Sequence, residues 1–281
     1  MRIIFYSVFE ICSDEMVLTS LLQKETTFPL DMAPNSIDDK YDGCRDEAFK
    51  RVDGYYLPHE KNTTTNFIRA WDIAEKHYNS KDKLTHDHIK AICAYSGGQT
   101  KIYPVFNQAV RTNRTEYTTS FQFHSLHFLL TDALRLLKEN QQGCHTTYRR
   151  TNMEFGGKVN QLIRFGFFAS SSLDKGISQS FGEKSCFEIK TCAGAYLKSY
   201  PVLGEQEKEV LIPPFEMFKI TKKEKGQNVL NCKSLFKLES GSSISCIKQT
   251  DYFQLPLFST SVVTTSSPGE LQMQAIIQAQ Q

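Results

Sequence analysis

The chain has 281 residues, of which 40% are hydrophobic and 23% are charged, so it is long enough for one large globular domain or two small ones. Its 33 lysines and arginines nearly balance its 31 aspartates and glutamates, which gives a formal net charge of +2. The sequence has no basic block and no basic stripe interleaved with aromatic residues, which excludes nucleic acid as an expected partner. No apolar run approaches the roughly 20 residues that span a bilayer, so we expect no membrane span.

The cysteines and sequons point to an oxidising compartment. Eight cysteines that form no Cys-x-x-Cys pair indicate disulfides rather than a zinc site. Sequons at Asn62 and Asn113 agree with export and predict N-glycosylation. Residues 1–27 make a poor signal peptide because Glu10 interrupts the apolar run, and we treat them as a leader or a disordered extension. The expected location is therefore secreted or extracellular.

The first half of the chain has the periodicity of helices. The clearest case is Phe123–Lys138, where leucines and alanines at three- and four-residue spacing form one face that must be buried. His124 and His127 lie three residues apart in this stretch, yet no carboxylate or cysteine nearby completes a metal site, so we expect no metal. The other predicted helices are Arg45–Val52, Asn66–Tyr78, Thr85–Tyr95 and Phe106–Arg111.

After Gly143 the pattern changes to short segments rich in Phe, Tyr, Ile and Val, separated by Gly, Pro, Ser and Asn, which is typical of strands. We therefore predict an α+β domain over residues 28–252, with a helical N-terminal half packed on a mixed, largely antiparallel β core. Residues 253–281 are rich in Ser, Thr and Gln and predict a flexible tail. The predicted strands are Thr146–Arg149, Gly166–Ala169, Cys186–Thr191, Ala195–Lys198, Glu209–Ile212, Met217–Lys222 and Ser234–Glu239.

Three polar features accompany the strands of the second half. Tyr148-Arg149-Arg150 lies on the first strand, Phe168-Ala169-Ser170-Ser171-Ser172 lies where the second strand is expected to give way to a helix, and Glu207-Lys208-Glu209 enters a later strand. Taken alone, each feature has an ordinary interpretation. The arginines would form surface ion pairs, the serines would cap a helix, and the glutamates would lie in a solvated loop. Because side chains alternate along a strand, Glu207 and Glu209 are expected to point to the same face.

Arginine, then Ser-x-Ser, then Glu-x-Glu, in this order, resembles the signature of the mono-ADP-ribosyltransferases. The run from Glu207 to Glu216 is similar to the vertebrate ecto-enzyme form in particular, as are Arg164-Phe165-Gly166, Asp38-Asp39-Lys40-Tyr41-Asp42-Gly43-Cys44 and Ile189-Lys190-Thr191-Cys192. The similarity covers roughly residues 28 to 250. It implies a fold of the ADP-ribosyltransferase type.

The resemblance also implies an activity. Such an enzyme moves ADP-ribose from NAD to arginine side chains of acceptor proteins and releases nicotinamide through an oxocarbenium-like transition state. NAD is then a co-substrate, and no other cofactor is expected. The use of NADP is left open.

The roles of the acidic and hydroxyl residues follow from the same resemblance. Glu209 matches the carboxylate that stabilises the positive charge developing at the ribose carbon. Ser170 matches the residue that orients this glutamate by a hydrogen bond, and Ser172 is expected to pack against or cap the following helix. Glu207 matches the acid that holds the acceptor guanidinium, which favours arginine transfer over hydrolysis of NAD.

The resemblance further implies a set of residues that bind NAD. Arg149 is expected to bind the pyrophosphate through its planar fork of donors. Arg150 stands where many relatives carry glycine, so either arginine could point inward, and the register of Tyr148 favours Arg149. Tyr148 and Phe168 complete the expected NAD-binding set with Ser170 and Glu209.

The cysteine pairs are another implication of the resemblance, which pairs Cys44 with Cys246 and Cys144 with Cys192. The four cysteines outside this pattern are Cys12, Cys93, Cys186 and Cys232. A bridge between Cys93 and Cys232 is left open, and Cys186 is expected to be a buried strand residue.

Two other functions are left open. One is an NAD glycohydrolase, with water as the acceptor. The other is a catalytically silent secreted protein of the same fold, against which the intact set of Arg149, Ser170, Glu207 and Glu209 speaks. The ending Ala275–Gln281 is too short and too polar for a lipid-anchor signal, and we expect a monomer.

Overall fold

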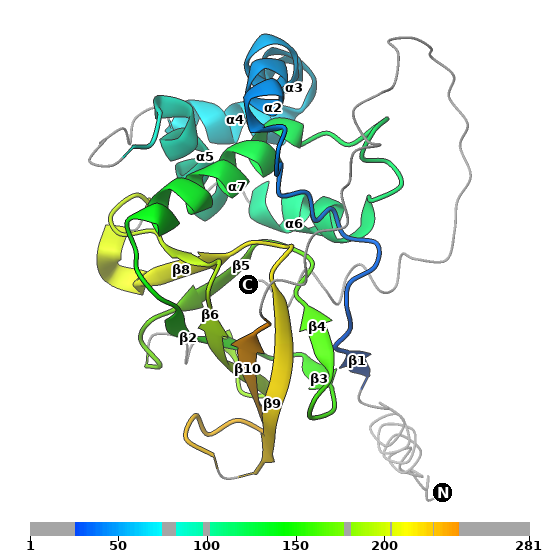
Figure 1. Ribbon diagram of the computed structural model, residues 1–281, viewed down its shortest axis with the longest axis vertical. Helices are drawn as coiled ribbons and strands as arrows, with labels where there is room; N and C mark the ends of the chain where they lie inside the picture. Colours follow the sequence, from blue (N-terminus) through cyan, green and yellow to red (C-terminus); the bar gives the residue numbers. More distant parts are fainter. Residues whose placement is uncertain are drawn as a thin grey trace, which may run out of the picture.

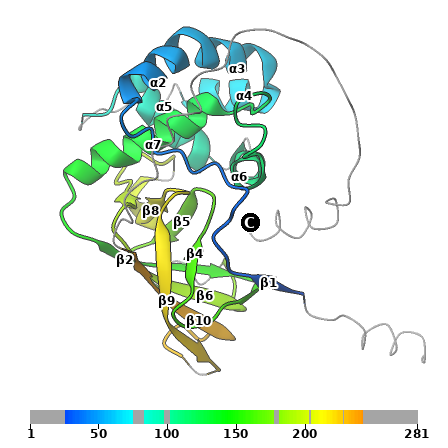
Figure 2. The same cartoon turned by 45° about the vertical axis from the view of Figure 1, so that its right-hand side comes forward.

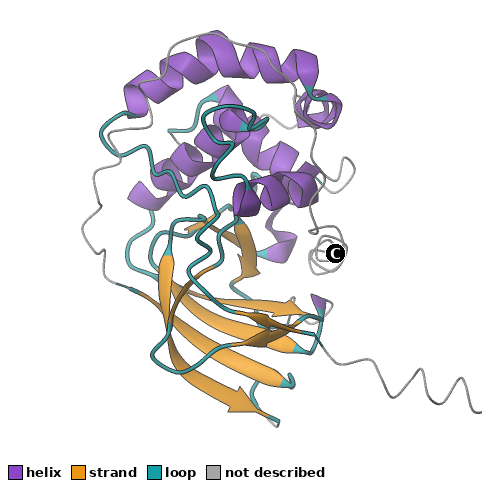
Figure 3. Cartoon of the chain, turned by 90° about the vertical axis from the view of Figure 1, so that its right-hand side faces the viewer, coloured by secondary structure: helices purple, strands orange, loops and turns teal. Residues whose placement is uncertain are grey.

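The computed structural model describes residues 26–74, 83–97, 102–176, 181–202, 204–226 and 228–241. Helices gather at one end of the described chain and strands at the other (Figures 1 and 3). The predicted leader at residues 1–27, apart from residues 26 and 27, and the predicted tail at residues 253–281 lie outside this part of the chain. Within the described residues, no helix is long and apolar enough to cross a membrane.

The helical layer matches the periodicity of the first half of the sequence. Its longest helix, α7, buries the predicted leucine face, with Leu126, Leu130 and Leu137 fully enclosed. The predicted helix from Asn66 is confirmed as far as Ala74, where the described segment ends. The helices are α2 (Arg45–Arg51), the π-helical turn η1 (Val52–Tyr56), α3 (Leu57–Thr63), α4 (Thr65–Ala74), α5 (His86–Ser96), α6 (Ile102–Thr112) and α7 (His124–Glu139).

The helix α3 was not predicted from the sequence. Gly54 and Pro58 have low intrinsic helix propensity, but η1 carries the chain through Gly54, and Pro58 lies in the first turn of α3, where its missing N–H is not needed. The buried carboxylate of Glu60 on α3 accepts hydrogen bonds from the backbone N–H groups of His124 (2.6 Å) and Ser125 (3.1 Å). It thereby satisfies donors that the start of α7 would otherwise leave unpaired.

The strands form one eight-stranded sheet in the order β4-β9-β10-β6-β2-β5-β8-β7, and β1 pairs with β3 separately. The β10–β6 and β1–β3 pairs are parallel, and the other described pairs are antiparallel. This confirms the predicted α+β class with a mixed, largely antiparallel core. The strands are β1 (Thr27–Pro29), β2 (His145–Thr151), β3 (Glu154–Gly156), β4 (Leu162–Arg164), β5 (Ala169–Ser172), β6 (Ser185–Thr191), β7 (Ala195–Tyr196), β8 (Glu209–Ile212), β9 (Met217–Lys225) and β10 (Ser234–Ser240).

The pair β5–β8 is the wall shared by the two hydrophobic cores. Phe168 and Leu211 pack into the core of the helical layer, whereas Ala169 and Ile212 pack into the core of the sheet. Figures 1 and 2 both place these two strands directly beneath the helices. Residues on β5 and β8 are therefore held from both sides.

The position of β5 corrects the sequence prediction. The strand is Ala169–Ser172 rather than Gly166–Ala169, so the serine run lies inside the sheet. Serine has little intrinsic preference for strands, and the prediction failed because the pairing of β5 with both β2 and β8 overrides that preference. Ser172 caps no described helix, because its Oγ instead donates to the carbonyl of Glu207 at 2.7 Å.

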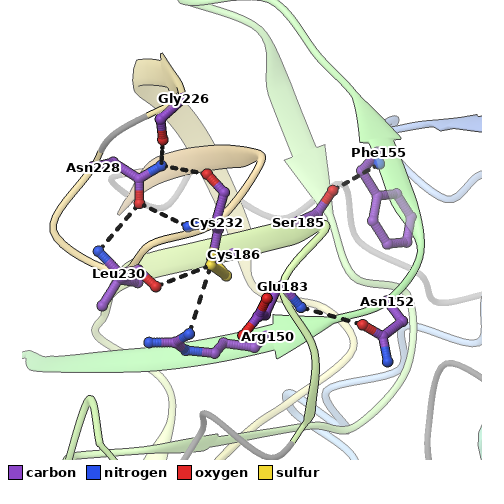
Figure 4. The surroundings of a disulfide bond; sticks show 10 residues. All are labelled: Arg150, Asn152, Phe155, Glu183, Ser185, Cys186, Gly226, Asn228, Leu230 and Cys232. Atoms are coloured by element: carbon purple, nitrogen blue, oxygen red, sulfur yellow. Dashed lines mark hydrogen bonds between the residues drawn. A yellow bond between two sulfur atoms is a disulfide. The ribbon is translucent and has the colours of Figure 1, made fainter.

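Two disulfides close the described sheet. The predicted Cys144–Cys192 bridge is confirmed. A second bridge joins Cys186 on β6 to Cys232 in the turn before β10, with the amide of Asn228 bonded to the backbone of that turn (Figure 4). Cys186 is thus a buried strand residue as predicted, and it is also half of a bridge.

The remaining cysteine predictions have different outcomes. The bridge left open between Cys93 and Cys232 is wrong, because the Cys93 thiol is free and donates to the carbonyl of Tyr200 at 3.1 Å. Cys44 forms no disulfide with a described residue, and Cys246 lies outside the described residues, so their pairing stays a prediction. Cys12 also lies outside the described residues.

Candidate active site

The two consecutive arginines of β2 point to opposite sides of the sheet. The guanidinium of Arg149 donates from Nη1 to the carbonyl of Ser170 at 2.7 Å and lies 5.5 Å from the ring centroid of Phe167. Arg150 instead lies beside the second disulfide, with Nη1 3.8 Å from the sulfur of Cys232 (Figure 4). Of the two, Arg149 is therefore the one beside the serine strand.

The side chain of Arg149 is half-buried, and groups of negative or potential negative charge lie near it. Burial lowers its pKa, while the hydroxyls of Tyr95 and Tyr103 and the carboxylate of Glu209 act in the opposite direction. A guanidinium that is partly shielded from water can bind an anion with less competition from the solvent. Arg149 therefore suits a phosphate group placed next to Ser170.

Glu209 is the first residue of β8 and is buried, with 6% of its surface exposed. Burial raises its pKa to about 7, and Glu207 adds to the rise, while a hydrogen bond from Ser170 and the charge of Arg149 lower it. The pairing of β5 with β8 places Ser172 opposite Glu209 and Ser170 opposite Leu211. Arg149 on β2, Ser170 on β5 and Glu209 on β8 thus come together from three neighbouring strands.

The three carboxylates between residues 205 and 209 differ in how deeply they are buried. Glu205 is exposed, Glu207 is half-buried and Glu209 is buried. The expected alternation along one strand is wrong for Glu207, because it ends a 3-10 turn (Gly204–Glu207) and Lys208 adopts a positive φ of 45° before β8 begins. The carbonyl of Glu207 is held by the hydroxyl of Ser172, so the acid is still fixed near Glu209.

A cavity of about 300 Å³ lies beside Arg149, between the first strand and the sheet. Glu209 and Ser170 are not among its lining residues. It is lined mainly by apolar side chains, and its charged groups are Asp31, Arg111, Arg149 and Arg164. The cavity therefore suits the part of a ligand that lies away from Glu209.

Arg111 is a cation at this cavity that sequence reasoning did not single out. Its Nη2 donates to the carbonyl of Phe165 at 3.1 Å, and its guanidinium lies 4.3 Å from the ring centroid of Phe167. Burial lowers its pKa to about 10, and the charge of Arg149 adds to this effect. Two guanidinium groups thus lie against one aromatic ring. Their positive charges repel each other, and a pair of linked phosphates bound beside them would reduce that repulsion.

The two aromatic residues of the predicted NAD-binding set lie in different surroundings. Phe168 is fully buried among Phe106, Tyr95 and His127, and its contact with NAD stays a prediction. Tyr148 lies on the strand face opposite to Arg149 and packs against the cluster around the second disulfide. The register alone did not show what covers each face, and the roles of both residues in binding NAD stay predictions.

Two buried polar residues of the helical layer also reach the site. Tyr95 on α5 donates to the carbonyl of Phe168 at 2.6 Å, and Asn107 on α6 bonds both the N–H and the carbonyl of Phe168 at 3.2 Å. Sequence reasoning missed them because their partner is more than fifty residues away along the chain, and nothing local marks them.

The histidines on α7 have protein partners. His127 bonds the hydroxyl of Tyr41 at 2.7 Å and the carbonyl of Ile37 at 3.2 Å, and burial lowers its pKa to about 4. His124 bonds the carbonyl of Tyr117 at 2.7 Å. Among the described residues, no group of three or more metal-ligating side chains is found.

The arrangement defines a class of protein: a mixed sheet under a helical layer, with an arginine, a serine and a glutamate on neighbouring strands of the sheet, is the architecture of an ADP-ribosyltransferase. The family model described as NAD:arginine ADP-ribosyltransferase matches residues 30–240. The chain therefore belongs to the NAD:arginine ADP-ribosyltransferase family, as the sequence resemblance predicted.

Curated relatives and solved structures agree with this family. The chain is 36% identical to the erythroblast NAD(P)(+)--arginine ADP-ribosyltransferase of Gallus gallus, over 68% of this chain and 67% of the relative. It is 37% identical to the T-cell ecto-ADP-ribosyltransferase 1 of Mus musculus, over 68% of each. The eukaryotic mono-ADP-ribosyltransferase ART2.2, solved as a variant in complex with NAD, superposes with a TM-score of 0.63 at 31% identity, covering 79% of this chain and 99% of that one.

Proposed function

We propose that this protein transfers ADP-ribose from NAD to arginine side chains of proteins and releases nicotinamide. The observation that carries the proposal is the buried carboxylate of Glu209, which has Ser170 and Arg149 beside it. The names of the relatives, which include NAD(P)(+)--arginine ADP-ribosyltransferase and ecto-ADP-ribosyltransferase, support the same reaction. Two disulfides and the ecto-enzyme names of relatives support an extracellular location.

The binding step uses the cations of the cleft. Arg149 and Arg111 both lie against the ring of Phe167, so a pyrophosphate placed between them would neutralise two half-buried charges that otherwise repel each other. Glu209 must lie near the ribose that carries nicotinamide, and it does not line the cavity beside Arg149. The adenosine half of NAD therefore extends into that cavity, and the nicotinamide half extends towards Glu209.

The chemical step breaks the bond between the ribose C1′ and the nicotinamide nitrogen. The electron pair leaves with nicotinamide, and positive charge develops on the ribose. The carboxylate of Glu209 stabilises this charge, and because its site excludes water, the interaction is stronger than it would be in solution. Ser170 keeps the carboxylate oriented through its hydrogen bond.

The acceptor step forms a bond between C1′ and a guanidinium nitrogen, which then loses a proton. Glu207 is half-buried at the end of a fixed turn, two residues before Glu209, at which the strand begins. It can therefore hold an acceptor guanidinium against the ribose and accept the proton as the new bond forms. If water reaches the ribose first, the same site hydrolyses NAD, which is the alternative activity.

The test compares wild-type protein with the Glu209→Gln variant for release of nicotinamide from labelled NAD in the presence of agmatine. The amide keeps the shape of the side chain but carries no negative charge. We expect at least a hundredfold loss of rate, in line with the loss of one electrostatic group aimed at a transition state. A variant that releases nicotinamide at the wild-type rate would exclude the role given to Glu209.

A further inference from the structure

Tyr95 and Asn107 attach the helical layer to the strand that carries Ser170. The hydroxyl of Tyr95 donates to the carbonyl of Phe168 at 2.6 Å. The amide of Asn107 donates to the oxygen of Tyr95 at 3.0 Å and to the same carbonyl at 3.2 Å, and its Oδ1 accepts from the N–H of Phe168 at 3.2 Å. Both polar backbone groups of Phe168 are thus held by side chains of α5 and α6.

This attachment begins where the sheet pairing ends. The ladder between β5 and β8 starts at Ala169, opposite Ile212, so the peptide groups of Phe168 lie one residue outside it. Without Tyr95 and Asn107 these groups would be buried without hydrogen-bond partners, which is unfavourable. The two side chains therefore extend the fixed part of β5 to a point two residues before Ser170.

Both residues are deeply buried, Tyr95 at 4% and Asn107 at 2% exposure. The ring of Tyr95 makes edge contacts with Phe106 and Phe168, at centroid distances of 6.2 and 6.3 Å. Packing alone needs only the ring, which phenylalanine would supply equally well. The hydroxyl must therefore be explained by its hydrogen bonds.

The hydroxyl of Tyr95 also faces the active site. The groups that influence its ionisation include a hydrogen bond with the side chain of Ser170 and the charges of Glu209 and Arg149. Ser170 and Glu209 lie on the paired strands β5 and β8, and a hydrogen bond from Ser170 lowers the pKa of Glu209. Tyr95 and Asn107 hold the backbone of Phe168, two residues before Ser170, and so fix the start of the strand that places Ser170 beside the buried carboxylate.

We propose that Tyr95, held by Asn107, is a positioning residue that fixes Ser170 so that its hydroxyl donates to Glu209. The kinetic consequence of this inference rests on the proposed function, whereas its structural consequence does not. Small displacements of a reacting group are costly, because about 1 Å can reduce a rate a hundredfold. We expect Tyr95→Phe to lower kcat about tenfold and to leave KM for NAD within about twofold, since Arg149 and Arg111 are unchanged.

A double-mutant cycle with Ser170→Ala separates positioning from general stability. If Tyr95 acts through Ser170, Tyr95→Phe should change kcat by less than about twofold once Ser170 is replaced. An equal tenfold loss in both backgrounds would overturn the inference. Tyr56→Phe is the matched control, because it removes a hydroxyl from the same helical layer at a ring that stacks on His124, away from β5.

A second measurement needs no turnover. The pKa of Glu209 can be followed in ligand-free protein by ¹³C NMR of labelled glutamate, with the Glu209→Gln variant identifying the signal. Because the hydrogen bond from Ser170 lowers the pKa of Glu209, Ser170→Ala should raise it, and Tyr95→Phe should raise it in the same direction. Glu207 and Arg149, which also face the carboxyl, are unchanged in both variants.

The two measurements distinguish the possible failures. An inactive wild-type protein whose Glu209 pKa still rises in Tyr95→Phe would refute the proposed function and support the positioning of Ser170. An active protein with additive kinetics and an unmoved Glu209 pKa would support the function and refute the positioning. Melting temperatures of Tyr95→Phe and Tyr56→Phe, measured together, show whether either variant has lost its fold.

Discussion

Replacing Glu209 by glutamine is expected to stabilise the fold while it abolishes activity. Burial holds the pKa of this carboxyl at about 7 in the folded protein, against an ordinary value of 4.5. The fold therefore favours the protonated, neutral form, and ionising the group inside the fold costs free energy. The rise from 4.5 to about 7 corresponds to about 3 kcal/mol, because one pKa unit is worth 1.36 kcal/mol.

The sign of this effect fixes its pH dependence. Between about pH 4.5 and pH 7 the folded protein retains a proton that the unfolded chain has released, so the contribution of Glu209 to stability falls as the pH rises through this window. Glutamine resembles the protonated form at every pH. The variant should therefore exceed the wild type in stability by less than about 1 kcal/mol at pH 5 and by about 3 kcal/mol at pH 8.

Urea denaturation of both proteins at pH 5 and pH 8, with the disulfides kept oxidised, measures the difference directly. Nicotinamide release from the same preparations shows whether the stabilised variant is inactive. If the stability difference between Glu209→Gln and wild type were the same at both pH values, burial would not have raised the pKa of Glu209. The claim that the fold disfavours the ionised form of Glu209 would then be refuted.

Three further predictions follow from the same geometry. Glu207→Gln should remove transfer to agmatine and leave some hydrolysis of NAD, and equal loss of both products would contradict its role at the acceptor. Arg149→Lys should raise KM for NAD about tenfold or more because the planar fork is lost, whereas Arg150→Lys on the opposite face should leave KM within about twofold in the same assay. Replacing Cys186 and Cys232 by serine opens a loop with a sequence separation of 46, which should lower the free energy of unfolding by about 4 kcal/mol in the chain-entropy model, and urea denaturation checks it.

The sequence predicted two kinds of feature: secondary-structure elements with a clear local pattern, and residues that belong to a motif. The leucines of α7 recur at the spacing of a helix and of no other element. The strands β6 and β8 are short apolar runs with clear ends. Arg149, Ser170 and Glu209 were identified by their order along the chain. The structure places all three around one point, but their roles stay proposals.

The features that the sequence did not predict depend on contacts between distant segments. Arg111 was read only as the end of a helix, although its position against Phe167 makes it a second cation at the cleft. Tyr95 and Asn107 resemble any other core residues until their shared partner on β5 is known. No local rule shows which buried polar groups will meet, because that depends on how the helices pack on the sheet.

The boundary of β5 failed for a related reason. A run of three serines favours a loop or a cap when only propensity is considered. In the structure, β2 and β8 supply hydrogen-bonding partners on both sides, and the strand is formed by its neighbours rather than by its own residues. The sequence did not predict the 3-10 turn before Glu209. The residue with the positive φ is Lys208, and a lysine in the sequence does not indicate such a backbone conformation.

The most direct test of the central claim is the fate of the ADP-ribose. Wild-type protein is incubated with labelled NAD and agmatine, and the products are separated by chromatography and identified by mass spectrometry. We predict ADP-ribosyl-agmatine as the major product, formed together with an equal amount of nicotinamide. Free ADP-ribose without the agmatine adduct, or no release of nicotinamide at all, would contradict the assignment of arginine ADP-ribosylation to this protein.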